Sequence, residues 1–150
     1  MAAKPASKTH LTRKQIEAIF ERRIKAHQKL DAEALLVDYA DECVVESPTG
    51  GTHTGRTAIR KTIQAWFDGF PDLKVESDGL HIDGNNVTWV LTAEGTDVGG
   101  FLGVPATGKR FRIPIVFLYE LKGGKIVRER RVYDFTGLLV QIGVLKAKPI

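Results

Sequence analysis

Two extended apolar runs, joined by a pair of glycines, constrain the fold of this chain more than any other feature. The first run spans residues 111–121 and the second ends at Tyr133, with Gly123 and Gly124 between them. Runs that meet at such a turn predict a β-hairpin. Asp134 follows the second run and precedes a short apolar segment. Its carboxylate therefore either faces an enclosed cavity or caps a terminal helix.

Three further strands are expected upstream of this hairpin. Residues 73–82 form one strand, broken at Asp78-Gly79 in a way that indicates a bulge. The Asp-Gly-Asn-Asn segment at 83–86 predicts a tight turn, after which residues 87–97 return antiparallel. A shorter strand at 42–47 ends at Pro48.

The first part of the chain has helical patterns instead. Thr12 and Gln15 have the spacing of a capping box, and the apolar stripe that follows predicts a helix of about five turns. Asp31 is placed to cap a second, shorter helix. A third helix is expected at 56–69, before Pro71.

Helices and strands therefore segregate along the sequence, which favours an α+β fold over a parallel doubly wound one. We expect a curved antiparallel sheet packed on the N-terminal helices, forming a cone-shaped barrel with an internal cavity. At 150 residues the chain is most simply one domain, at 11–150, after a flexible basic tail at 1–10.

Composition restricts the classes of function. The net charge is +4, but the first 14 residues carry four basic side chains with no aromatic residue among them, which indicates a solvated tail rather than a nucleic-acid surface. The single cysteine, Cys43, excludes an internal disulfide and a cysteine-based metal site, and it is expected to be packed rather than reactive. No signal peptide or membrane-spanning run is evident, so we expect a soluble, cytoplasmic protein without membrane or nucleic-acid partners.

Several short motifs carry a family resemblance that covers nearly the whole chain after the tail. They are His-Thr-Gly-Arg at 53–56, Trp-Phe at 66–67, Phe-Pro-Asp-Leu at 70–73, Gly-Thr at 95–96, Phe-Leu-Gly-Val-Pro-Ala-Thr-Gly-Lys-Arg at 101–110, Gly-Lys-Ile at 124–126, Asp134, and Gly-Leu-Leu-Val-Gln-Ile-Gly at 137–143. In this pattern the chain resembles the SnoaL-like polyketide cyclases of the nuclear-transport-factor-2-like superfamily. It departs from them at Asp97, where the family typically has a histidine, and at Ala106, where a second proline is common.

The resemblance implies a function. It suggests a small, cofactor-independent enzyme that closes a ring in a hydrophobic, carbonyl-bearing molecule by an intramolecular aldol reaction, with Asp134 as the general acid and base. It also implies a homodimer that pairs through the open sheet face. Two alternatives remain open: an epoxide hydrolase or isomerase of the same fold, for which Asp97, Arg130 and Asp134 supply the residue types of a hydrolase, and a domain that binds small molecules without catalysis.

Strand alternation makes the role of Asp134 conditional. It places Arg130, Val132 and Asp134 on one face and residues 129, 131 and 133 on the other. If the first face lines the cavity, desolvation raises the pKa of Asp134 and the carboxylate can remove a proton next to a carbonyl. Arg130 could then hold the enolate.

Other residues are weaker candidates for catalysis. Asp97 shares a strand face with Trp89 and could be a second carboxylate of the site, or a turn residue before Gly99. His53 could be a proton shuttle or a solvated loop residue. His27 and His81 are expected to pack at a boundary, and His10 belongs to the tail. No histidine spacing indicates a metal site. The expected pocket walls are Trp66, Phe67, Trp89, Phe117 and Tyr119.

Overall fold

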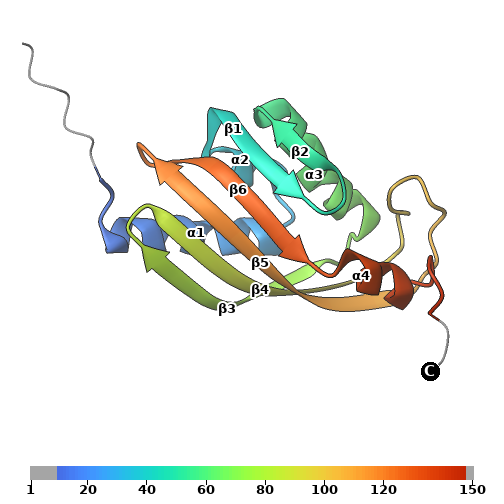
Figure 1. Cartoon of the computed structure of the whole chain (residues 1–150). Coiled ribbons are helices and arrows are strands. Elements are labelled where there is room, and N and C mark those ends of the chain that lie inside the picture. Colours follow the sequence, from blue (N-terminus) through green and yellow to red (C-terminus); the bar gives the residue numbers. More distant parts are fainter. Residues whose placement is uncertain (1–9, 148–150) are drawn as a thin grey trace, which may run out of the picture.

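The computed structural model describes residues 10–147. The helices and strands within these residues follow in this order (Figure 1): α1 (Arg13–Gln28), α2 (Ala32–Leu36), β1 (Tyr39–Ser47), β2 (Gly51–Thr54), α3 (Arg56–Gly69), β3 (Lys74–Asp83), β4 (Asn86–Thr96), β5 (Arg110–Lys122), β6 (Lys125–Tyr133) and α4 (Phe135–Gln141). The α+β class is confirmed. All of the tail predicted at 1–10 except His10 lies outside the described residues.

The N-terminal helices begin where the sequence predicts. Thr12 Oγ1 accepts from the Gln15 backbone at 3.2 Å, and Gln15 Oε1 accepts from the Thr12 backbone at 2.8 Å, so the capping box is complete. Asp31 Oδ1 accepts from the Ala34 amide at 3.0 Å and caps α2. The buried stripe of α1 includes one charged residue, Arg23.

The sheet has the strand order β2-β1-β6-β5-β4-β3. All neighbours are antiparallel except β1 and β6, which are parallel. The four long strands β3–β6 are confirmed, as is the irregularity between Ser77 and Gly79. Three details differ from expectation. β1 and β6 pair in parallel, although an antiparallel sheet was expected. β1 starts three residues earlier, at Tyr39, and the Gly-rich segment at 51–54 forms the strand β2, which was not predicted.

A second irregularity lies in β6 and decides which side chains face inward. Leu121 pairs with Ile126 but Glu120 pairs with Arg128, so β6 contains one extra residue at Val127. The extra residue reverses the alternation that begins at Ile126. As a result Glu129 and Arg131 are buried, whereas Arg130 and Val132 are exposed.

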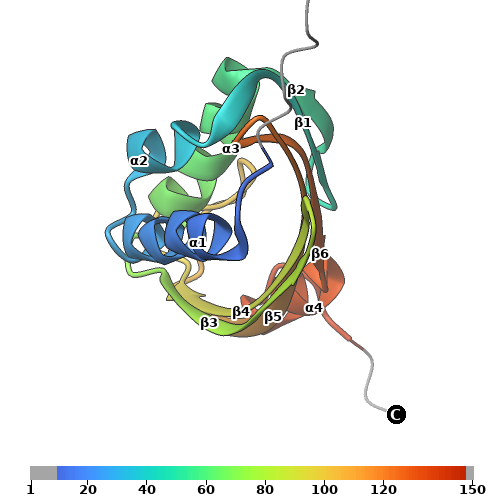
Figure 2. The same ribbon diagram turned by 90° about the vertical axis from the view of Figure 1, so that its left-hand side faces the viewer.

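The helices cover the concave side of the sheet. Figure 2 shows the sheet curving around α1, α2 and α3, with its two edges apart. The edge strands are β2 and β3, so the sheet is curved but unclosed, and the predicted barrel is incomplete. Apolar side chains from both layers form the core between them. No helix within residues 10–147 is long and apolar enough to cross a membrane.

Candidate functional site

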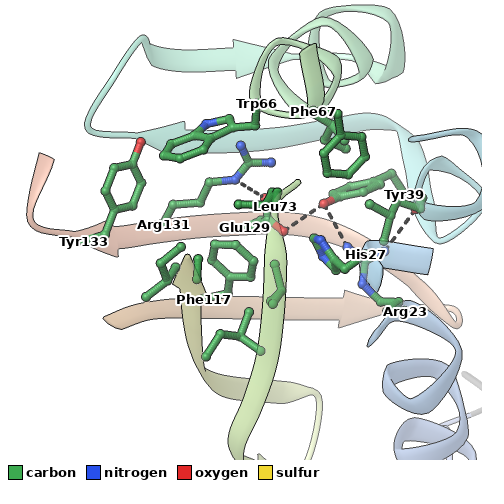
Figure 3. Close-up of a pocket in the computed structure, with 16 residues that line it drawn as sticks. Arg23, His27, Tyr39, Trp66, Phe67, Leu73, Phe117, Glu129, Arg131 and Tyr133 are labelled. Carbon is green, nitrogen blue, oxygen red and sulfur yellow. Dashed lines mark hydrogen bonds and ion pairs between the residues drawn. The ribbon is translucent and has the colours of Figure 1, made fainter. Parts of the chain in front are cut away.

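A pocket lies between the concave face of the sheet and the helices (Figure 3). Its volume is about 60 Å³, and its surface is mostly apolar. The lining residues come from α1, α2, α3 and five strands or their ends: Arg23, His27, Leu35, Tyr39, Ile63, Trp66, Phe67, Leu73, Val75, Leu91, Ala93, Ile115, Phe117, Glu129, Arg131 and Tyr133. Since a cavity of roughly 150 Å³ is needed to hold a benzene ring, a substrate enters only if part of this lining moves.

One wall of the pocket is polar. Arg131 donates from Nε to Glu129 Oε2 at 2.8 Å, and the Tyr39 hydroxyl donates to Glu129 Oε1 at 2.8 Å. The guanidinium of Arg131 also lies 5.7 Å from the centre of the Phe117 ring. Within the described chain, the two terminal nitrogens of Arg131 form no hydrogen bond to protein atoms. They are therefore available to an oxygen of a bound molecule.

This wall continues into the helical layer. Arg23 Nη2 donates to the Tyr39 hydroxyl at 3.1 Å, and Arg23 Nη1 donates to the Leu35 carbonyl and to Asp38 Oδ2 at 3.0 and 3.2 Å. The guanidinium lies 5.0 Å from the Tyr39 ring centre. Asp38, Arg23, Tyr39, Glu129 and Arg131 thus form one continuous buried chain, which we call the polar chain.

The polar chain keeps Glu129 ionised. Burial opposes ionisation of Glu129, but Arg131, Arg23 and the Tyr39 hydrogen bond outweigh it, so the pKa of Glu129 lies below its ordinary value. Burial, and then the negative charge of Glu129, raise the pKa of Tyr39. Glu129 is therefore a carboxylate and Tyr39 a neutral donor at neutral pH.

His27 is the one histidine that lines the pocket. Its Nε2 is buried and has no hydrogen-bond partner in the described residues, and its ring lies 5.9 Å from Trp89 and 6.4 Å from Phe67. Burial, together with Arg23 and Arg131, lowers the pKa of His27 to about 3. The imidazole is therefore neutral, and Nε2 is an acceptor whenever the ring proton is on Nδ1.

Trp66 and Tyr133 lie together at the end of the pocket away from Arg23 (Figure 3). Both are partly exposed, and their ring centres are 5.5 Å apart. The Tyr133 hydroxyl lies 3.1 Å from Thr49 Oγ1 and 3.3 Å from Ser47 Oγ, which belong to β1 and the turn after it. Because both rings are partly exposed, their movement would disturb the core less than movement of the buried lining residues would.

Asp134 does not lie in the pocket. Its side chain is exposed and Oδ1 accepts from the Gly137 amide at 2.8 Å, so Asp134 is the N-cap of α4. The cause is the extra residue at Val127, which turns Arg130, Val132 and Asp134 away from the cavity. Asp134 is therefore surrounded by solvent and not by the apolar groups that a cavity-facing position would provide.

The other predicted polar residues also lie outside the pocket. Asp97 is buried, but Oδ2 accepts from the amide and hydroxyl of Thr107 at 3.0 and 3.1 Å, so it holds the loop between β4 and β5. Arg130 is exposed on the outer face, 3.7 Å from Glu46. His53 is half-buried in the edge strand β2. The structure therefore does not bring Asp97, Arg130 and Asp134 together.

Three of the five predicted wall residues, Trp66, Phe67 and Phe117, line the pocket. Trp89 and Tyr119 are buried behind it, and Trp89 Nε1 donates to Ser77 Oγ at 2.8 Å. Cys43 is buried in the core. No group of three or more metal-ligating His, Cys, Asp or Glu side chains occurs between residues 10 and 147.

Sequence analysis missed the polar chain and the place of His27 in the pocket. In β6, Arg131 faces inward and Val132 outward because of the extra residue at Val127, which the sequence does not mark. A signal was present in α1, where Arg23 interrupts the apolar stripe. A charged residue at a buried position of an amphipathic element indicates a polar partner inside the fold.

Comparisons with known proteins agree with this architecture. Residues 18–142 match the profile of the SnoaL-like polyketide cyclase family. No functionally curated protein matches the chain. Among solved structures, TsrD from Streptomyces laurentii has 26% identity and a TM-score of 0.80, over 90% of this chain and 99% of TsrD.

Two further structures have the same TM-score of 0.80. AclR from Streptomyces galilaeus has 23% identity, over 92% of this chain and 87% of its own. A SnoaL-like protein from Jannaschia sp. CCS1 has 21% identity, over 98% of this chain and 100% of its own. Because the family profile matches most of its length, this chain belongs to the SnoaL-like polyketide cyclase family.

Proposed function

We propose that the protein is a cofactor-independent enzyme that enolises a hydrophobic, carbonyl-bearing small molecule, most like a polyketide ester cyclase acting by intramolecular aldol closure. One observation carries the proposal: Arg131 presents two unused terminal nitrogens to an apolar, aromatic pocket. Donors held in such surroundings stabilise an oxyanion more strongly than donors in water do.

The charges of the pocket suit a neutral substrate that becomes negative during the reaction. Arg131 is paired with Glu129, so the pocket already has a counter-ion when a ketone or ester enters. The N–H groups of Arg131 then meet additional negative charge only as the enolate forms. An interaction that strengthens between ground state and transition state accelerates the chemical step.

His27 supplies the proton acceptor in this proposal. Its neutral Nε2 is a buried, unpartnered basic atom on the pocket wall. Burial, Arg23 and Arg131 together disfavour protonation of His27, and an enolate held on Arg131 offsets the last of these three effects. Proton transfer to His27 is therefore most favourable when the oxyanion lies on Arg131, which couples the two steps.

The resulting sequence of steps needs no further reactant. His27 removes a proton next to a carbonyl, and the electron pair of the broken C–H bond moves into the enolate. The enolate carbon attacks a second carbonyl of the same molecule and forms the C–C bond. The new alkoxide takes the proton back from His27, which restores the starting state.

Family resemblance gives the acid and base role to Asp134, and its position as the cap of α4 favours His27 instead. The two assignments differ in one experiment. The wild type, His27→Gln, Arg131→Gln and Asp134→Asn are incubated in D₂O with 2-tetralone, a bicyclic ketone, and NMR follows exchange of the protons next to its carbonyl.

We expect the wild type and Asp134→Asn to catalyse exchange, and the His27 and Arg131 variants to lose at least about a hundredfold, the lower range for one acid-base group. Loss in folded Asp134→Asn alone transfers the role to Asp134. If the wild type binds the ketone without exchange, the function is small-molecule binding without catalysis.

A further inference from the structure

Within the polar chain, the carboxylate of Glu129 lies between Tyr39 and Arg131 and accepts a different hydrogen bond at each oxygen. Glu129 Oε1 accepts from the Tyr39 hydroxyl and Oε2 accepts from Arg131 Nε, both at 2.8 Å. Tyr39 comes from β1 and Glu129 from β6, which pair in parallel. The hydroxyl therefore fixes the orientation of the carboxylate from a neighbouring strand.

Every member of the polar chain is buried, with exposed fractions of 1% for Arg23, 4% for Asp38, 2% for Tyr39, 1% for Glu129 and 9% for Arg131. Ion pairs in such places are often no more stabilising than apolar packing of the same volume. Stability alone thus explains the polar chain poorly. The orientation that the polar chain imposes on Arg131 explains it better.

That orientation determines how many N–H donors of Arg131 are free to bind a ligand. A carboxylate and a guanidinium left to themselves tend to form two parallel hydrogen bonds, which use Nε and one terminal nitrogen. Here Oε1 is held by Tyr39, and the pair makes one hydrogen bond, through Nε. Each carboxylate oxygen can accept two hydrogen bonds, so Tyr39 acts by drawing Oε1 toward β1 rather than by occupying it, and both terminal nitrogens of Arg131 are left to the pocket.

We propose that Tyr39 is a positioning residue that, through Glu129, keeps both terminal nitrogens of Arg131 free to bind an anionic oxygen of the ligand. Arg23 holds the Tyr39 hydroxyl from the opposite side, at 3.1 Å. The inference rests on the role of Arg131 in the proposed function. It is tested by binding, so it can fail or hold independently of turnover.

The chain contains a matched control for Tyr39. Tyr119 is also a buried tyrosine, and the Arg23 guanidinium lies 5.6 Å from its ring centre, compared with 5.0 Å for Tyr39. The Tyr119 hydroxyl, however, has no hydrogen-bond partner in the described residues. Tyr119→Phe therefore removes the same atom from the same buried cluster, but it removes no hydrogen bond to Glu129.

The experiment compares Tyr39→Phe and Tyr119→Phe with the wild type, using benzoate and benzamide as probes of similar shape and different charge. We expect Tyr39→Phe to weaken benzoate binding about tenfold, the effect of one hydrogen bond to a charged group, and to change benzamide binding less than twofold. Tyr119→Phe should change neither by more than twofold. Equal losses for both probes in Tyr39→Phe, or no loss at all, would overturn the proposal.

A second measurement uses only the folded wild type, in case Tyr39→Phe does not fold. NMR of ¹⁵N-labelled arginine side chains, assigned with Arg131→Lys, should show slowed rotation of the terminal groups of Arg131 when benzoate binds. Unchanged Arg131 signals at saturating benzoate contradict the proposal. If Tyr39→Phe selectively weakens benzoate binding but the wild type does not exchange ketone protons, the positioning role stands and the proposed catalytic function fails.

Discussion

Arg22 and Arg23 are adjacent in the sequence and bind the same carboxylate, that of Asp38, but only one of them is inside the protein. The Arg22 side chain is 49% exposed and makes two hydrogen bonds to Asp38, at 2.6 and 3.1 Å. The Arg23 side chain is 1% exposed and makes one, at 3.2 Å, together with its bonds to Leu35 and Tyr39. By number and length of hydrogen bonds, the Arg22–Asp38 pair is therefore the better one. The Arg23–Asp38 pair matters more for stability because it is buried.

Replacement of the two arginines should separate these effects. We expect Arg23→Met to lower the free energy of unfolding by about 3 kcal/mol, because the buried carboxylates of Asp38 and Glu129 lose a neighbouring positive charge and the Tyr39 hydroxyl loses a donor. Arg22→Met should cost less than about 1 kcal/mol, since solvent screens that pair. Urea unfolding of both variants measures the difference. Equal losses would show that the inner arginine has no special role in stability.

The low pKa of His27 predicts how stability depends on pH. The folded state holds His27 neutral down to about pH 3, whereas the unfolded chain protonates it near 6.5. Between these values the unfolded state binds more protons, so stability should fall as pH is lowered from 6.5, by up to about 1.4 kcal/mol per pH unit.

His27→Gln isolates this contribution. Below about pH 4.5 Glu129 adds a loss of the same sign, because its folded pKa is also depressed. The informative window is therefore pH 6.5 to 5, in which the variant should show a smaller slope than the wild type. Parallel curves in that window would contradict a buried, neutral His27.

Asp134 provides a test of the capping assignment. Asparagine caps a helix about as well as aspartate does, whereas alanine cannot accept the Gly137 amide. Asp134→Ala should lower the free energy of unfolding by about 1 kcal/mol, and Asp134→Asn should change it by only a few tenths. Thermal or urea unfolding measures both. Similar losses in the two variants would point to a role for the negative charge itself.

The hydrogen bonds of Tyr133 should control entry into the pocket. Tyr133→Phe removes the bonds to Thr49 and Ser47 and leaves the ring against Trp66. Because such bonds each contribute about 0.5–1.5 kcal/mol, we expect association and dissociation rates of 2-tetralone to rise together by about 3- to 10-fold. Stopped-flow tryptophan fluorescence follows both rates. Unchanged rates would mean that the ligand enters elsewhere.

We expect the protein to self-associate through the outer face of its sheet, as the family resemblance implies. Val90, Val116 and Val132 pair across three strands in one outward row, and Val132 is 48% exposed. We expect a homodimer in solution and a monomer for Val132→Lys, measured as molar mass by light scattering. The pocket variants serve as controls, since they should keep the mass of the wild type. A monomeric wild type would remove this prediction.

Much of the fold could be predicted because local chemistry determined it. Thr12 and Asp31 cap helices through atoms only three residues away. Gly123 and Gly124 both have positive φ, as the tight β5–β6 turn requires. The candidate site depended instead on one extra residue at Val127, which nothing in the local sequence marks. Its effect passes to every later residue of the strand. Strand alternation therefore left Asp134 undecided between the cavity and the cap of α4, and Glu129 and Arg131 were overlooked.

The parallel pairing of β1 with β6 has a consequence for how the protein is made. Tyr39 and Glu129 are 90 residues apart in the sequence, and their hydrogen bond joins the two strands that complete the pocket. A ribosome must release the chain as far as β6, which ends at Tyr133, before this strand can reach β1. Until then one edge of β1 has no partner strand, and the apolar side chains of its inner face are incompletely covered. Nascent chains shorter than about 130 residues should therefore be the forms that most need chaperones.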